Sequence, residues 1–147
     1  MEGVLRWKHE GIEAIRWHGP VIECLVRFHH HDEPSWEDLH HFATWQHLDQ
    51  IRSFYHRLFW FGQKDPHRQL GLIKQAPKPE EIVKVLRPLM DSEQPVRLLR
   101  RWRRNCRPED RDGAIKDLEG RIRWIEIQRR NEQNEKIQRE ALDNNTD

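Results

Sequence analysis

Alternating apolar and polar positions open the chain. Residues 5–9, 15–18 and 26–30 each alternate, with Gly11 and then Gly19-Pro20 between them. Alternation indicates strands with one buried face, and glycine and proline mark the turns. We therefore predict a three-stranded antiparallel β-meander within residues 1–31. Its apolar face is predicted to hold Leu5, Trp7, Ile15, Trp17, Ile22, Cys24, Val26 and Phe28.

Apolar residues at helical spacing follow the predicted meander. They recur every three or four positions from Trp36 to about residue 61. Ser35 is typical of an N-cap, because its hydroxyl accepts a bond from a free amide at a helix start. We predict a long helix over residues 34–61 that covers the apolar face of the sheet.

The rest of the chain is predicted to be a connection followed by helices. Residues 62–79 are rich in proline and glycine and are expected to form the connection. Helices are predicted over residues 80–90, 95–107 and 114–140. The polar residues 143–147 are expected to be a disordered tail. The whole pattern predicts a single α+β domain over residues 1–142, in which a meander and its helix precede a helical C-terminal half.

An apolar seam runs along the last predicted helix. Its four residues follow a 3-4-3 spacing, typical of helices that pair along one face. After it, charged residues occupy the equivalent positions. We predict that the seam is a protein interface, such as a homodimer contact, formed by Ile115, Leu118, Ile122 and Ile125.

An arginine cluster is the main chemical signal. Residues 96–107 contain six arginines and no carboxylate. On a helical wheel the arginines occupy about 160°, opposite an apolar arc. Neighbouring guanidinium groups repel unless an anion lies across them, and their planar fork binds phosphate with two hydrogen bonds. The predicted phosphate-binding residues are Arg97, Arg100, Arg101, Arg103, Arg104 and Arg107.

A second basic patch is predicted on the outer face of the meander, from Arg6, Arg16 and Arg27. Lys8, His18 and His29 share this face. The net charge is only +1, so local clustering rather than the overall field has to attract a polyanion. The alternative for both patches is a solvated surface whose arginines pair with nearby acidic segments.

Several classes of chemistry have no signal in the sequence. The chain lacks the GxSxG, P-loop and GxGxxG motifs, and its histidines and cysteines lack zinc-site spacing. Cys24 and Cys106 lie far apart in the sequence and form no CxxC motif, which is typical of free thiols in a reducing compartment. No apolar run reaches the roughly 20 residues of a membrane span. We expect a non-enzymatic intracellular protein, cytoplasmic or nuclear, without cofactor, metal or membrane contact.

Composition adds one hint about origin. The chain has 19 arginines against 7 lysines, with 7 tryptophans and 1 tyrosine. Such skew occurs where reading frames overlap in compact viral genomes. We therefore predict a small accessory nucleic-acid-binding protein, with RNA or duplex backbone favoured over DNA bases; a viral regulatory or host-defence-suppressing role is one interpretation. The alternative is an adaptor that binds a host or other partner protein through exposed tryptophans and its C-terminal helix.

Overall fold

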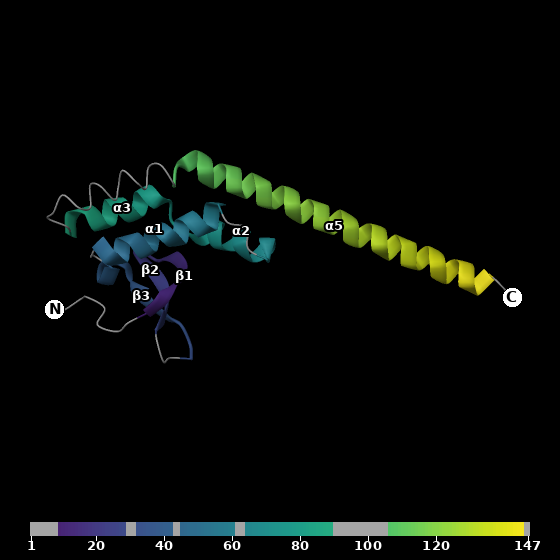
Figure 1. The fold of residues 1–147 in the computed structure, drawn as a ribbon, viewed down its shortest axis with the longest axis horizontal. Helices are drawn as coiled ribbons and strands as arrows, with labels where there is room; N and C mark the ends of the chain where they lie inside the picture. The colour runs from purple at the N-terminus through teal and green to yellow at the C-terminus, as the bar shows by residue number, and fades with distance from the viewer. Residues whose placement is uncertain (1–8, 29–31, 43–44, 61–63, 90–105, 146–147) are drawn as a thin grey trace.

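The structure, a computed structural model, describes residues 9–28, 32–42, 45–60, 64–89 and 106–145. These residues form the predicted α+β architecture, in which a three-stranded antiparallel sheet is followed by helices, the last of them long (Figure 1). The sheet has the order β1-β2-β3, with strands β1 (His9–His18), β2 (Val21–Phe28) and β3 (Ser35–Asp38).

The hairpin between β1 and β2 confirms one predicted turn and one predicted face. Gly19 has φ 59°, a left-handed conformation that glycine adopts without strain, so it suits the turn into β2. Along β2 every second side chain is buried, as alternation predicts: Ile22, Cys24, Val26 and Phe28.

Strand β1 differs from the prediction. Residues 5–8 lie outside the described part of the chain, and Gly11 lies within the strand rather than in a turn. Two register shifts, between His9 and Gly11 and between Ile12 and Ala14, interrupt the alternation. Ile15 still lies on the predicted face and is buried, whereas Trp17, two residues nearer the turn, is 45% exposed, and its Nε1 donates to Glu81 Oε2 at 3.1 Å.

The prediction of a helix over residues 34–61 is wrong at its start. Ser35 begins β3, which pairs antiparallel with β2, so tertiary pairing overrides the local helix signal. A 3-10 turn, η1 (Leu39–Phe42), follows, and Asp38 Oδ1 accepts a hydrogen bond from the backbone of His40 at 2.9 Å. The helix itself, α1, spans Trp45–Trp60.

Helix α2 (Pro66–Gln75) forms where the sequence predicts a connection. Asp65 caps it, because Oδ1 accepts from the backbone amides of His67 and Arg68 at 3.1 and 3.2 Å. Pro66 occupies the first turn, where its missing N–H costs nothing. The predicted helix over residues 80–90 is α3 (Pro79–Leu86), followed by the 3-10 turn η2 (Arg87–Leu89).

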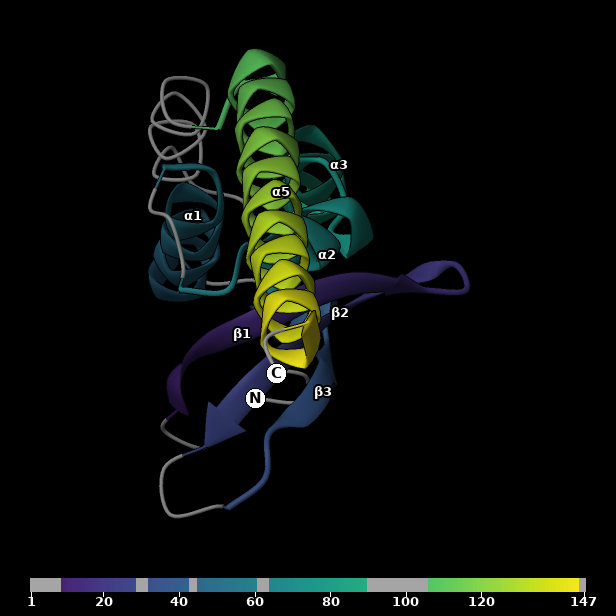
Figure 2. The same cartoon turned by 90° about the vertical axis from the view of Figure 1, so that its right-hand side faces the viewer.

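The last helix, α5 (Pro108–Asn145), is longer than predicted at both ends. It begins before residue 114, and residues 143–145, expected to be disordered, continue it. Helices α1 and α2 cover one face of the sheet, and α5 packs against these two helices, as Figures 1 and 2 show. The core lies between the sheet and these helices and includes Leu118 of α5.

Candidate nucleic-acid interface

The predicted arginine helix lies almost wholly outside the described residues, which include only Cys106 and Arg107 of it. Nothing is therefore observed for Arg97, Arg100, Arg101, Arg103 and Arg104. The exposed Arg107 donates to Asp110: Nε lies 3.4 Å from Oδ2, and Nη2 lies 3.4 Å from Oδ1. This hydrogen bonding raises the pKa of the Arg107 guanidinium. Arg107 thus pairs with a nearby carboxylate, as expected if the arginines form a solvated, ion-paired surface rather than a phosphate site.

The arginines of the sheet are also paired. Arg16 Nη2 donates to Glu23 Oε1 across the β1-β2 hairpin at 3.0 Å, and its guanidinium lies 3.7 Å from the ring centroid of Trp36. Arg27 Nε donates to Glu13 Oε1 at 2.7 Å. Arg6 lies outside the described residues. Because Arg16 and Arg27 are half-buried and each meets a carboxylate, they offer little net charge to a polyanion.

Charge is divided unevenly along the chain. Residues 9–49 contain two arginines and eight carboxylates, whereas residues 52–78 contain six Lys and Arg and only Asp65. The Asp65 carboxylate is occupied as the cap of α2, and Arg52 pairs with Asp49 at 3.0 Å. Four of the remaining cations lie on or beside α1 and α2 and define what we call the α2 basic surface: Arg57, Lys64, Arg68 and Lys74.

Arg57 and Arg68 of the α2 basic surface line one hollow of about 200 Å³ beside β1. Among the residues that the structure describes, Arg57 donates to two neutral oxygens, Ser53 Oγ at 3.1 Å and the backbone oxygen of Ile12 at 3.5 Å. Glu13 also lines the hollow, but its carboxylate is bonded to Arg27. Within the described part of the chain, neither arginine has a carboxylate at ion-pair distance, so both can receive an anion.

Sequence reasoning missed the α2 basic surface. Its members lie on α1, on α2 and between these helices, and α2 was expected to be a connection. The available signal was the stretch of six cations against one carboxylate in residues 52–78.

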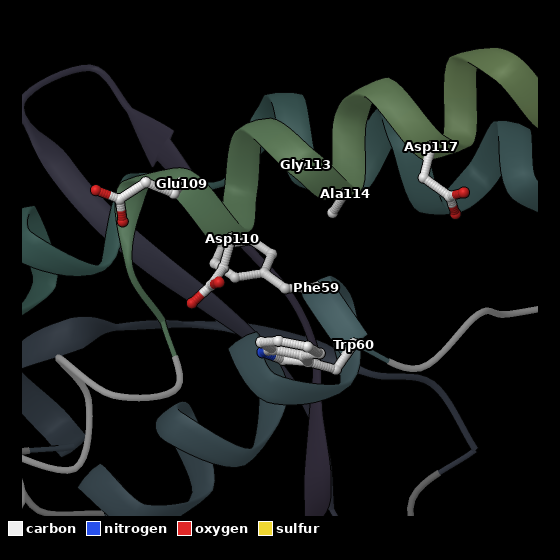
Figure 3. Close-up of a pocket in the computed structure, with 7 residues that line it drawn as sticks. All are labelled: Phe59, Trp60, Glu109, Asp110, Gly113, Ala114 and Asp117. Atoms are coloured by element: carbon white, nitrogen blue, oxygen red, sulfur yellow. The ribbon is translucent and has the colours of Figure 1, made fainter.

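A second hollow, of about 270 Å³, has the opposite charge. It lies where the end of α1 meets the start of α5, with the aromatic side chains of Phe59 and Trp60 on one side (Figure 3). The carboxylates around it belong to Glu109, Asp110 and Asp117. Carboxylates beside an aromatic wall suit a cationic group and repel phosphate.

The predicted dimer seam lies on the side of α5 that packs on the body. Leu118 is buried in the core and Ile115 packs against it, while Ile122 and Ile125 are half-buried. The first two residues of the seam, Ile115 and Leu118, therefore pack within one chain. A partner could reach only the later residues of this seam.

In the described part of the chain, nucleophiles and metal ligands form no arranged site. Cys24 and Cys106 are buried free thiols, and burial raises the pKa of both, to about 12 for Cys106 and higher for Cys24. A thiol is nucleophilic as the thiolate, so neither is activated. Among the described residues, no three His, Cys, Asp or Glu side chains gather as metal ligands, and no helix could cross a membrane.

The described residues thus define an α+β protein with an acidic N-terminal segment, cations on and beside α1 and α2, and a long terminal helix. No family model, curated protein or solved structure matches the chain.

Proposed function

We propose that the protein binds the phosphate backbone of nucleic acid, RNA or duplex, through the α2 basic surface. The supporting observation is that Arg57 and Arg68 share one hollow and have neutral or no partners there. Phosphate contacts require such uncompensated cations, whereas Arg16, Arg27 and Arg107 are paired. Contacts of this kind position a backbone and do not select bases. The arginines of residues 97–104 remain predicted contributors.

The test is a mobility-shift titration with single- and double-stranded RNA and DNA at two salt concentrations. The test variant carries Arg57→Ala, Arg68→Ala and Lys74→Ala. The matched control removes three exposed cations from α5, with Lys116→Ala, Arg121→Ala and Arg123→Ala. We expect the test variant to reduce the slope of log affinity against log salt by about 2–3, because roughly 0.7–0.9 counterions are released per phosphate contact. The control should retain the wild-type slope.

A third variant, with Arg100, Arg101, Arg103 and Arg104 changed to Ala, separates the two basic regions. If it loses binding while the α2 variant does not, the phosphate contacts lie in residues 97–104 and the role of α2 is wrong. If the wild-type protein binds none of the four nucleic acids at low salt, the proposed function itself is wrong. Circular dichroism of every variant shows whether it is folded.

A second candidate, a protein-interaction adaptor, is favoured by the acidic hollow. Trp60 is exposed there and Asp117 lines the same hollow, an arrangement suited to an arginine or lysine side chain of a partner, whereas Asp110 is already bonded to Arg107. Calorimetric titration with an arginine-containing peptide tests it. We expect Trp60→Ala or Asp117→Asn to weaken binding, while loss of Arg68 leaves it unchanged.

A further inference from the structure

The second half of α5 extends away from the body (Figure 1). Leu118 is the last buried residue of the helix, and every residue described from 129 to 144 is exposed. At 1.5 Å per residue this is about 24 Å of helix. Isolated helices of this length are marginal in water unless side-chain pairs or a partner stabilise them. The exposed second half of α5 therefore has a surface available to a partner.

The exposed apolar side chains of this half fit one heptad register. Large apolar residues are normally covered, yet four here are at least half exposed: Trp124 at 63%, Ile127 at 50%, Ile137 at 53% and Leu142 at 66%. Counted from Trp124 as position a, Ile127 falls at d, Ile137 at g and Leu142 at e. These four positions are the ones at which two helices of a coiled coil touch.

The same register has no charge at its core positions. Between residues 124 and 144, 9 of 21 residues are charged, so uncharged positions at every a and d are informative. Asparagine at position a is tolerated in two-stranded coiled coils and fixes their register. The a and d positions are Trp124, Ile127, Asn131, Asn134, Gln138 and Ala141. They define what we call the outer seam.

The outer seam is separate from the face that packs on the body. At 100° per residue, the seam from Ile115 to Ile125 points to nearly the opposite side of α5. Leu118, in that inner seam, is buried in its own chain, whereas Trp124 and Ile127 are exposed. Packing of α5 on the body therefore leaves the outer seam open.

We propose that two copies of the chain pair through the outer seam as a parallel, in-register coiled coil. In that arrangement a g residue lies beside the e residue five positions later in the partner helix. Arg130 then meets Glu135 of the partner subunit, twice per dimer, and Ile137 meets Leu142 of the partner subunit. An antiparallel pair places g beside g and e beside e, which removes both matches.

Pairing is expected to be weak and independent of the proposed function. The outer seam has three amides and one alanine among its six core positions, so it buries little apolar surface. We expect dimers in the micromolar range or above. Nucleic-acid binding could fail in every titration described above and the dimer would still form.

Charge exchange tests the orientation. Sedimentation equilibrium of the full chain measures the dimer dissociation constant for wild type, Arg130→Glu, Glu135→Arg and the double variant. Each single change replaces two attractive pairs with two repulsive ones, so we expect about a tenfold weaker dimer. The double variant should recover most of the wild-type affinity, short of the small contribution of the Glu135–Arg139 pair within each helix, which it also loses. Positions 130 and 135 lie about 140° apart on their own helix, so this recovery cannot arise within one chain. Arg129→Glu, at outer position f, should change the constant little.

Cysteine cross-linking gives a second, independent test. In a parallel pair, the Asn134→Cys variant places two identical d positions together, and mild oxidation should yield a covalent dimer. Lys136→Cys, at position f, should not cross-link. The native thiols are buried and do not interfere. The proposal is overturned if the wild type stays monomeric at every attainable concentration, if the double charge variant recovers nothing, or if both cysteine variants behave alike.

Discussion

Two buried side-chain hydrogen bonds attach α2 and the segment after it to α1. Tyr55 donates its hydroxyl to the backbone oxygen of Pro77 at 2.6 Å, and Gln69 Nε2 donates to that of Leu58 at 2.8 Å. Burial of a polar group is unfavourable unless it is paired, so each bond compensates two groups at once. The position of α2, and with it Arg68, depends on these bonds.

Tyr55→Phe therefore has a predictable cost. The change removes the donor and leaves the oxygen of Pro77 buried without it, so we expect the free energy of unfolding to fall by about 1–3 kcal/mol. Urea denaturation followed by circular dichroism measures this loss. Gln75→Ala, at an exposed position of α2, is the control and should change stability by less than about 0.5 kcal/mol. A Tyr55→Phe protein as stable as the control variant would contradict the assigned role of the hydroxyl.

At the scale of single residues, the sequence predicts which side chains are buried better than which charges meet. The alternation of β2 is strong enough to assign Ile22, Cys24 and Val26 to the core. The pairing of Arg27 with Glu13 depends on strand register, because Glu13 lies at the shift between Ile12 and Ala14 of β1. Alternation alone does not locate such shifts.

At the scale of elements, α2 shows how turn-forming residues can be misread. Pro66 and Pro77 suggest a connection, yet a proline in the first turn is compatible with a helix, and Pro77 comes after the helix has ended. Strand β3 shows the reverse error, because Ser35 looks like a cap but pairs with β2. In both places the structure is decided by an interaction with a neighbouring residue or strand. Apolar periodicity along the chain carries no information about such an interaction.

The cap of α2 can be tested at Asp65. Asp65→Ala removes the acceptor for the backbone amides of His67 and Arg68, so we expect a loss of about 0.5–2 kcal/mol in the free energy of unfolding. Asp65→Asn keeps an oxygen acceptor and should retain most of that stability. Thermal denaturation compares the variants, and hydrogen exchange at the two amides should accelerate only in Asp65→Ala. Equal stability of the Ala and Asn variants would rule out capping as the role of Asp65.

At the scale of the whole molecule, the two halves of α5 have different roles. The first half completes the core through Ala114 and Leu118, whereas the exposed second half has carboxylates four residues before cations, as in Glu132–Lys136 and Glu135–Arg139. The second of these pairs lies at 3.8 Å. Pairs in this order stabilise a helix by about 0.2–0.5 kcal/mol each. The sequence predicts a helix here, but apolar spacing does not distinguish a body-facing seam from a partner-facing one.

Deleting residues 129–147 should therefore leave the body as stable as before, because every residue described in that segment is exposed. Leu118→Ala should lower the free energy of unfolding by about 2–5 kcal/mol, since it opens a cavity in the core. Both are measured by urea denaturation at protein concentrations too low for dimers, because pairing adds apparent stability by mass action. At high concentration the truncated chain should lack the concentration dependence that the proposed pairing would give the full chain. If truncation destabilises the dilute protein as much as Leu118→Ala does, the second half of α5 is part of the folding unit.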